Sequence, residues 1–372
     1  MAATASEYKY YNITITNNGT KNLDQPAEIH INLTKYLLQD PSQYRMIIDK
    51  FSVDGEAIPL GLIELKNPQT IKTQDWETIH TVYIVNQSGA VGSAGVLFNS
   101  ERLPNIPPAP YRTEGGMGYY TNTNPYFFIY TYTYMIRKIN DALMNAYTQV
   151  FGDTSFPKFV YDPLTQLITL FAPRATFDSS LINPARIYIS MSLLKYVGEG
   201  FAGPFVGANF IPGIPEPTKS YDITNNSISD PKSDATFLAI PQEYSAITSF
   251  STINTILLTS TNLPIRQEFF PANQHPYELR GDESLASQYA NLSAFRIISI
   301  FYPNTTSAGD YRGTIFYSSG SILDNDLIDL DRNTPLTEIH IQVFFTDNFN
   351  NVYPLTLIPG KSVNMRLAFV KK

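Results

Sequence analysis

The chain has 372 residues, of which 43% are hydrophobic and 16% are charged, and its formal net charge is −7. This balance is typical of a globular protein and excludes a disordered chain, although the charged share lies below the usual quarter of a soluble domain. Cysteine is absent and Lys and Arg are scattered, which excludes disulfides and thiolate chemistry and argues against direct binding of nucleic acid.

Residues 1–7 form a short polar arm ahead of the first expected strand. The N-terminus has no apolar core segment, so we expect no signal peptide. No apolar run of about 18 residues occurs, so we also expect no membrane span. Apolar residues then alternate with polar ones, and this period of two predicts strands over 11–15, 29–33, 44–53 and 81–85.

A stretch rich in glycine and proline covers residues 86–125. We interpret it as an elaborated surface connection, because compact domains seldom contain long featureless loops without a functional reason. One helix is expected after it, over residues 134–150, because its apolar side chains recur at helical spacing. Gly152 stands just past its end, where a helix stop signal is expected.

The remainder of the chain has mainly the pattern of strands, interrupted by a second stretch rich in glycine and proline over 198–217. The last strands are the clearest, because Val363, Met365, Leu367 and Phe369 alternate with polar residues, as in a strand with one buried face. Strands are expected over 159–161, 167–171, 186–194, 253–259, 295–301, 314–317, 339–345 and 363–369.

Many strands, one main helix and long connections indicate an all-β fold, a single jelly roll (an antiparallel β-sandwich) with an inserted, loop-rich second domain. If the first and last strands share one sandwich, the middle of the chain is the insertion. We therefore expect the jelly-roll core over residues 1–95 and 291–372, and the insertion over 96–290.

Four histidines and one acidic run are the candidates for metal or catalytic chemistry. His30 and His340 lie on the polar faces of expected strands, and no two histidines have metal-ligand spacing on one element. Asp324, Asp326 and Asp329 would suit Ca²⁺, or a pair of them glycoside hydrolysis, but the run lacks EF-hand spacing. We expect a solvated loop there, with no metal, no cofactor and no catalytic group.

Arg280-Gly281-Asp282 is an RGD tripeptide in an expected loop. Integrins recognise this motif, so receptor binding is one interpretation. Chance occurrence in a chain of this length is the alternative that we favour. A carbohydrate-binding site would instead use the Tyr- and Asn-rich loops over 99–126 and 198–217.

Three segments together carry a resemblance to a known family. The first contains Pro125-Tyr126-Phe127-Phe128 and then Ile139-Asn140-Asp141-Ala142-Leu143. The second contains Leu263, Pro264 and Ile265 with Glu268 close behind, and the third is the C-terminal stretch with Asp347. In this order they resemble the penton, or vertex, capsid proteins of virophages and polinton-like double-stranded DNA viruses, which are of single jelly-roll type.

The resemblance implies structural work and no enzymatic activity. Five copies would form a ring that closes each icosahedral five-fold vertex, surrounded by hexamers of the major capsid protein and in contact with minor capsid proteins. The protein would be located in the virion, assembled in the host cytoplasm or virus factory, with the insertion on the outer surface. A host receptor or a glycan would be a further partner.

The composition agrees with a permanent ring, because such interfaces are enriched in aromatic residues and depleted in Lys and Glu. The chain has 25 tyrosines and 23 phenylalanines. Two other functions stay open at this point. One is a carbohydrate- or receptor-binding jelly roll of the spike or lectin type, and the other is a glycosidase on a β-scaffold.

Overall fold

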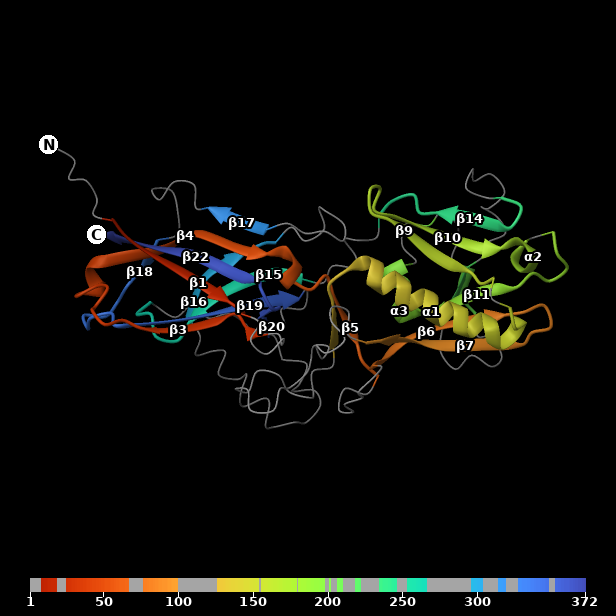
Figure 1. The fold of residues 1–372 in the computed structure, drawn as a ribbon, viewed down its shortest axis with the longest axis horizontal. Helices are drawn as coiled ribbons and strands as arrows, with labels where there is room; N and C mark the ends of the chain where they lie inside the picture. The colour runs from red at the N-terminus through yellow and green to blue at the C-terminus, as the bar shows by residue number, and fades with distance from the viewer. Residues whose placement is uncertain are drawn as a thin grey trace. The chain divides into compact units, whose positions relative to one another are not determined.

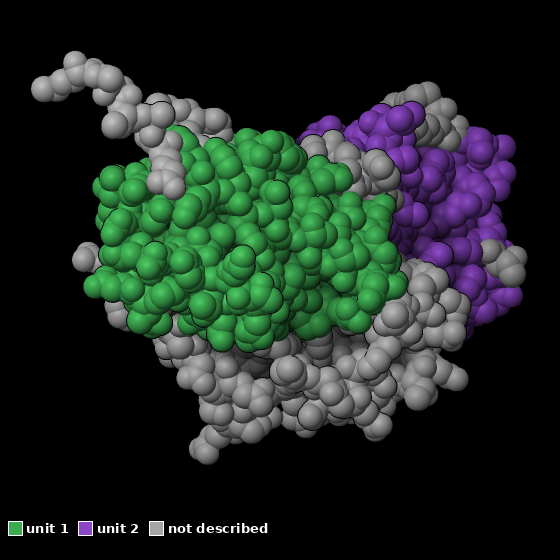
Figure 2. All heavy atoms as spheres, turned by 60° about the vertical axis from the view of Figure 1, so that its left-hand side comes forward, with its two compact units in different colours: residues 1–58, 252–307, 312–372 green, residues 59–251, 308–311 purple. Residues whose placement is uncertain are grey.

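The structure is a computed structural model in which the chain divides into two compact units. Unit 1 contains Met1–Ile58, Thr252–Ser307 and Arg312–Lys372, and unit 2 contains Pro59–Ser251 and Ala308–Tyr311 (Figure 2). The residues that the structure describes are 8–18, 25–66, 76–99, 126–153, 155–178, 180–197, 201, 206–209, 218–221, 234–245, 253–265, 296–303, 314–318, 327–347 and 352–372.

The first sheet of unit 1 joins the two ends of the chain. Its strands are β1 (Tyr8–Thr16), β4 (Tyr44–Asp54), β17 (Thr314–Ser318), β18 (Ile328–Asp329) and β22 (Ser362–Lys371). They lie in the order β1-β22-β4-β17, with β18 also paired to β4. The red first strand and the blue last strand run side by side in Figure 1, antiparallel, with Tyr8 opposite Val370.

The second sheet of unit 1 lies in the order β16-β15-β19-β20, with β3 paired to β19 beyond the end of β20. A separate short pair of strands, β2 and β21, is also antiparallel. The strands are β2 (Gln25–Pro26), β3 (Glu28–Asn32), β15 (Ile253–Ser260), β16 (Arg296–Phe301), β19 (Glu338–Asp347), β20 (Val352–Pro354) and β21 (Thr356–Leu357).

The two sheets of unit 1 pack through their apolar faces. Phe51 of β4 stacks on Phe301 of β16, with 4.6 Å between the ring centroids. Ile341, Val363 and Leu367 have no exposed surface, because alternate residues of each strand point into the sandwich. Two antiparallel sheets in this order form a jelly roll, so the predicted all-β fold class is confirmed. Two short 3₁₀ turns flank β4, η1 (Pro41–Gln43) and η2 (Gly55–Ala57).

Unit 2 contains a sheet in the order β12-β13-β11-β6-β7, a second in the order β14-β10-β9, and the pair β5–β8. Two short helices, α2 (Arg174–Phe177) and α3 (Met191–Val197), follow β10 and β11. The strands are β5 (Gly61–Glu64), β6 (Trp76–Val85), β7 (Val91–Phe98), β8 (Tyr126–Ile129), β9 (Lys158–Asp162), β10 (Leu167–Pro173), β11 (Arg186–Ser190), β12 (Val206–Asn209), β13 (Thr218–Tyr221) and β14 (Phe237–Pro241).

The long helix α1 (Tyr132–Phe151) organises the core of unit 2. It begins where the Thr131 hydroxyl accepts a hydrogen bond from the Tyr134 amide, and it ends at Gly152, whose φ is 65°. Its apolar stripe packs against β6, β7 and β9 and forms the centre of one buried cluster. The predicted helix is therefore confirmed, two residues longer at the start and one at the end.

Two local predictions need correction. The expected strand over 186–194 ends at Ser190, and α3 begins at Met191. The stretch over 86–125 is not wholly irregular, because strand β7 occupies Val91–Phe98. Strand β7 contains several small residues, so it lacks the apolar alternation that predicts a strand. One of these small residues, Gly92, is required by close packing against α1. A Cβ at Gly92 would clash with the carbonyl oxygen of Ala146 in α1.

The division into units differs from the expected boundaries after residue 95 and before residue 291. Strand β6 belongs to unit 2 because it pairs with β11, and β7 because it pairs with β6 and packs against α1. Strand β15 belongs to unit 1 because it pairs with β19. The pairing partners of these strands determine the unit to which each strand belongs.

Candidate functional site

The segment after β15, which carries part of the family resemblance, folds as a buried turn against β19. Leu263 and Ile265 are buried, and Ile265 forms a β-bridge with Leu330. The carbonyl of Pro264 accepts a hydrogen bond of 2.8 Å from the amide of Asp331. Leu263, Pro264 and Ile265 therefore act as anchors of the fold. Glu268 lies outside the described residues.

Two polar side chains, one at the last residue of β15 and one in the turn after it, extend the hydrogen-bond ladder of β19. The side-chain oxygen Oδ1 of Asn262 accepts from the backbone amide of His340 at 2.8 Å, and the Ser260 hydroxyl donates to the backbone carbonyl of His340 at 2.5 Å. Main-chain pairing of β15 with β19 stops at Gln342. Side chains thus replace the missing strand and satisfy a backbone that would otherwise lose its partners.

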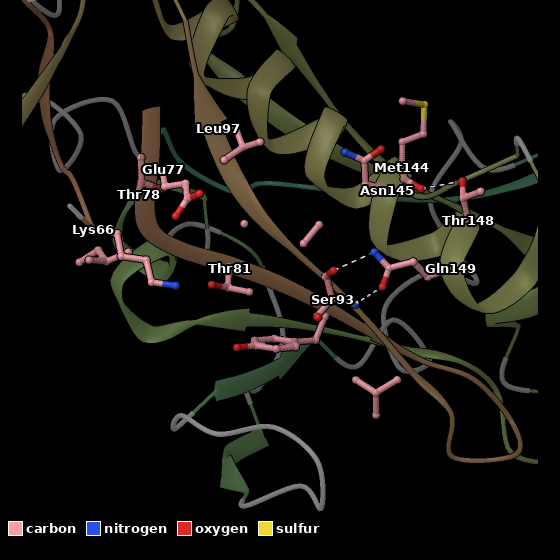
Figure 3. A pocket seen from close by; sticks show the side chains of 15 residues that line it. Lys66, Glu77, Thr78, Thr81, Ser93, Leu97, Met144, Asn145, Thr148 and Gln149 are labelled. Carbon is pink, nitrogen blue, oxygen red and sulfur yellow. Dashed lines mark hydrogen bonds between the residues drawn. The ribbon is translucent and has the colours of Figure 1, made fainter. Parts of the chain in front are cut away.

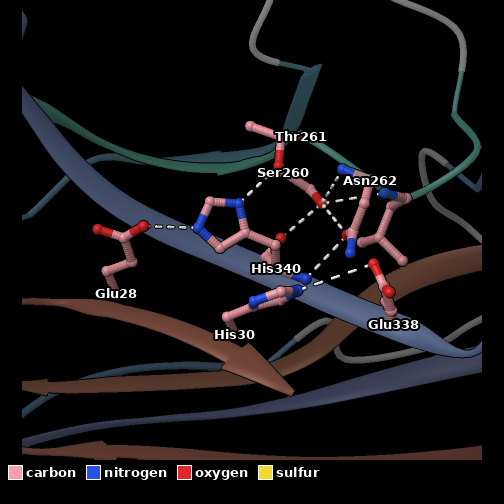
Figure 4. A network of polar contacts seen from close by, with 8 residues as sticks. Glu28, His30, Ser260, Thr261, Asn262, Glu338 and His340 are labelled. Atoms are coloured by element: carbon pink, nitrogen blue, oxygen red, sulfur yellow. Dashed lines mark hydrogen bonds and ion pairs between the residues drawn. The ribbon is translucent and has the colours of Figure 1, made fainter. Parts of the chain in front are cut away.

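The imidazole of His340 lies in a polar network on the outer face of β3 and β19 (Figure 4). Its Nε2 lies 2.6 Å from a carboxylate oxygen of Glu28, and its Nδ1 lies 2.6 Å from the hydroxyl of Thr261. His30 stands directly opposite on β3, with ring centroids 5.6 Å apart, and its Nε2 lies 3.8 Å from Glu338. Each histidine is thus held by a glutamate of the other strand.

This histidine pair is the feature that sequence analysis missed, although both histidines were placed on polar strand faces. Glu28 and His340 are 312 positions apart, and only the antiparallel register brings them together. The available signal was a repeated tetrapeptide, Glu-Ile-His-Ile, which occurs over 28–31 and 338–341. The two Nε2 atoms point toward different carboxylates, and no metal-holding group of three ligands occurs among the described residues.

His80 is a buried core residue of unit 2. Its Nδ1 lies 2.9 Å from the hydroxyl of Ser192, and its ring packs edge-on against Tyr196 at 5.3 Å. Only 1% of His80 is exposed. Although a serine and a histidine in contact have the composition of a catalytic dyad, a substrate could not reach this imidazole, so the contact is structural.

Asn140 of α1, which also belongs to the segments that carry the resemblance, fixes the helix to β9. Its amide donates to the carbonyl of Phe159 and accepts from the amide of Phe159, both at 2.7 Å. Asp347 has a similar structural role at the end of β19, where it is buried and accepts a hydrogen bond of 3.2 Å from Tyr353. Both residues join neighbouring elements of the fold.

Asp329 is held by two cations of its own chain. Arg45 lies 3.1 Å and Lys372 lies 3.2 Å from the same carboxylate oxygen. Hydrogen bonds from Lys372 and then from Arg45 hold the pKa of Asp329 below its usual value. Arg45 and Lys372 thus compete with any metal ion for this carboxylate, and binding of Ca²⁺ by the acidic run stays a prediction. Asp324 and Asp326 lie outside the described residues.

Arg280, Gly281 and Asp282 also lie outside the described residues, so receptor binding by the RGD tripeptide stays a prediction. The loops expected to bind carbohydrate, over 99–126 and 198–217, lie almost wholly outside the described residues. Their role in binding a glycan stays a prediction as well.

A hollow of about 1340 Å³ opens beside β7 and α1 in unit 2 (Figure 3). Leu97 and Met144 line it, and so does Gln149, whose side-chain amide pairs with the backbone N–H and C=O of Ser93 at 3.0 and 2.9 Å. Tyr83, the aromatic side chain in its lining, is only 5% exposed. Without an accessible ring or a converging charged cluster in this lining, the hollow indicates no ligand class.

Comparisons with known proteins place these structural residues in context. The family model of the Sputnik minor capsid protein V18/19 matches residues 9–371. Structural protein V19 of Sputnik virophage is 27% identical over 228 residues, which cover 58% of this chain and 94% of V19. Uncharacterized protein V18 of the same virophage is 29% identical over 145 residues, which cover 38% of this chain and 83% of V18.

Two solved structures share the fold over nearly the whole chain. A chain in the cryo-EM structure of Sputnik virophage matches with a TM-score of 0.70 and 25% identity, covering 98% of each chain. The crystal structure of the mavirus penton protein matches with a TM-score of 0.56 and 16% identity, covering 98% of this chain and 100% of that one. The second likeness concerns the fold alone.

Among the helices within the described ranges, none combines the length and the hydropathy needed to cross a lipid bilayer. The side chains singled out by sequence analysis, where they are described, hold strands and turns together. The matched family is one of capsid proteins, which confirms the prediction of a structural protein rather than an enzyme. With a family model that matches residues 9–371, the chain belongs to the Sputnik minor capsid protein V18/19 family and is a structural capsid protein of the virophage type.

Proposed function

We propose that five copies of this chain form a ring that closes the five-fold vertices of an icosahedral virophage capsid. The observation that carries the proposal is the extent of the likeness to the mavirus penton protein, which covers 98% of this chain and 100% of that one. The likeness therefore includes the jelly roll and the inserted unit together, and not the common sandwich alone.

The composition of the chain supports a permanent ring. Only 16% of the residues are charged, and interfaces that stay closed are depleted in charge and enriched in aromatic residues. A closed ring is built from heterologous contacts, in which one patch of each copy meets a different patch of its neighbour. The partners in the shell would be the major capsid protein and other minor capsid proteins.

The topology of unit 1 supports an orientation in the shell. Strand β4 starts at Tyr44, beside Lys371 near the end of the chain, and Tyr8 near its start lies opposite Val370. The chain leaves unit 1 after Ile58, past the opposite end of β4. The termini and the exit toward the insertion thus lie at opposite ends of one sheet, which suits termini that face inward and an insertion that faces outward.

The oligomeric state of the purified protein tests the proposal. We expect native mass spectrometry to give a particle of five times the 41.8 kDa chain mass, and negative-stain images to show five-fold rings. A protein that remains monomeric at every concentration up to the solubility limit, or that closes as a trimer or hexamer, would contradict it.

A further inference from the structure

A hydroxyl, an imidazole and a carboxylate form a continuous hydrogen-bonded relay on the outer face of β3 and β19 (Figure 4). The Thr261 hydroxyl lies 2.6 Å from Nδ1 of His340, and Nε2 of the same ring lies 2.6 Å from a carboxylate oxygen of Glu28. The three residues come from the turn after β15, from β19 and from β3. Segments far apart in the sequence thus bring together the groups that activate a hydroxyl nucleophile.

The direction of each hydrogen bond in the relay follows from the chemistry of the three groups. An ionised carboxylate can only accept, so the Nε2–H of His340 donates to Glu28. In a neutral imidazole the other ring nitrogen is an acceptor, so the Thr261 hydroxyl donates to Nδ1. His340 is therefore placed as a general base for Thr261, and Glu28 is a positioning residue that fixes the tautomer and stabilises the imidazolium.

The exposure of the relay suits a reaction with a molecule from solution. Thr261 is exposed, whereas the side chain of His340 is 16% exposed and that of Glu28 is 28% exposed. The nucleophile is thus accessible while its base is partly shielded from water, and this shielding strengthens the contact between imidazole and carboxylate. The contact of Ser192 with His80 differs, because that imidazole is buried in the core of unit 2.

The backbone beside Thr261 restricts the class of reagent. The amides of Asn262 and Leu263 donate to the Ser260 hydroxyl at 3.3 and 3.1 Å, so they are not available to stabilise an oxyanion. Peptides and simple esters react slowly without that stabilisation. Activated acyl esters, such as thioesters and phenyl esters, have leaving groups that depart readily and are the class that this relay suits.

We propose that Thr261 is a site of covalent acylation by activated acyl esters. The Thr261 oxygen attacks the acyl carbon and forms a new ester bond, while its proton passes to Nδ1 of His340. The bond between the acyl carbon and the leaving thiolate or phenolate breaks, and the proton then passes from His340 to the leaving group or to water. The ester on Thr261 persists, because its hydrolysis needs oxyanion donors. The chain is therefore modified once and does not turn over substrate.

Acetylation of the full-length protein by p-nitrophenyl acetate tests the proposal, with peptide mass spectrometry to locate each acetyl group over time. Thr14 is the internal control, because it is exposed and its hydroxyl donates to the neutral side-chain oxygen of Asn364 at 2.9 Å. We expect Thr261 to be acetylated at least about a hundredfold faster than Thr14, the usual contribution of a placed general base.

Two variants test the relay behind Thr261. We expect His340→Ala to slow acetylation of Thr261 at least about a hundredfold, because the base is lost. Glu28→Gln keeps a hydrogen-bond acceptor but removes the charge that stabilises the imidazolium, and should slow it at least about tenfold. The double variant should react as slowly as His340→Ala alone, because Glu28 acts only through His340. A merely structural role of Glu28 would instead add to the loss.

His30→Ala is the matched control, because His30 stands opposite His340 and its Nε2 lies 3.8 Å from Glu338. This variant should leave acetylation of Thr261 nearly unchanged. Equal rates at Thr261 and Thr14 would overturn the proposal, and so would a rate at Thr261 that survives His340→Ala or Glu28→Gln. Melting curves establish that each variant is folded. If His340→Ala does not fold, His340→Gln gives the same comparison.

Discussion

Amide and hydroxyl side chains form hydrogen bonds with backbone groups of strands at positions where main-chain pairing ends. Asn140 pairs with both backbone groups of Phe159, Gln149 does the same for Ser93, and Asn262 serves His340 with help from Ser260. Uncharged donors and acceptors can satisfy a backbone without the cost of burying a charge. The small number of charged residues and the many Asn, Gln, Ser and Thr residues are therefore consistent with a fold in which uncharged side chains satisfy backbone groups.

Asp329 gives a prediction that depends on pH. Its pKa is lower in the folded chain than in the unfolded chain, because Lys372 and Arg45 hydrogen-bond to the carboxylate. Its contribution to stability is therefore present above the unfolded pKa near 3.8 and is lost as the pH falls through the folded pKa. We expect Asp329→Asn to lower the melting temperature at pH 7 by about 1–2 °C, since exposed ion pairs contribute little.

Melting temperatures measured at acid pH distinguish this electrostatic effect from a packing defect. Below the folded pKa of Asp329 the variant and the unchanged protein should melt together, because the carboxyl is then neutral in both. Asp331→Asn is the control, since the described residues provide no ion pair for that exposed side chain. A difference in melting temperature that persists in acid would refute the electrostatic explanation.

At the residue scale, sequence patterns located the polar faces but not the partners across strands. Leu263, Ile265 and Asp347 were singled out by resemblance, and the structure gives them anchoring roles in the turns around β19. The pair of His30 and His340 depends on the register between segments at opposite ends of the chain. No local pattern determines that register, because the apolar alternation of a strand is compatible with many partners.

Helix α1 and strand β7 show how one element depends on a single glycine of another. The helix approaches β7 so closely that Gly92 faces the carbonyl oxygen of Ala146. The helix itself was predictable, because its apolar stripe and its caps are local signals. Strand β7 was not, because close packing selects small residues that lack strand propensity. The close contact with α1 thus requires small residues in β7, and small residues do not give the alternating apolar pattern from which a strand is predicted.

Two glycines of β7 provide a matched test of this packing. Gly92→Ala places a methyl group against the backbone of α1 and should lower the free energy of unfolding by about 1–3 kcal/mol, the usual range for overpacking. Gly95→Ala meets only the carbonyl oxygen of His80 at 3.9 Å, an ordinary contact, and should change stability by less than about 1 kcal/mol. Urea unfolding of both variants checks the difference, and equal effects would disprove the steric explanation.

The whole molecule consists of two units with separate apolar cores. The buried cluster around α1 contains residues from Leu60 to Ile240 and so lies within unit 2. The sandwich core of unit 1 is built from the two ends of the chain and the segment after Thr252. The sequence pattern predicted a jelly roll with an inserted domain, but the unit boundaries differ from the expected ones. A strand belongs to the unit that supplies its pairing partner, and the sequence pattern does not identify that partner.

Two core truncations test whether the cores unfold separately. We expect calorimetry to resolve two transitions, with Leu143→Ala lowering only the one that belongs to unit 2 and Leu367→Ala only the one that belongs to unit 1. Both leucines have no exposed surface, so each truncation should cost about 2–5 kcal/mol. If either variant shifts both transitions equally, the two units unfold as one.

The pairing of β1 with β22 also determines when the first sheet of unit 1 can form during synthesis of the chain. Thr14 bonds to Asn364 across 350 positions, so a growing chain cannot complete the first sheet of unit 1 until its last strand has left the ribosome. Unit 2 is almost continuous, from Pro59 to Ser251, and can fold while synthesis continues. The first sheet of unit 1 is therefore completed after the main segment of unit 2 has been synthesised.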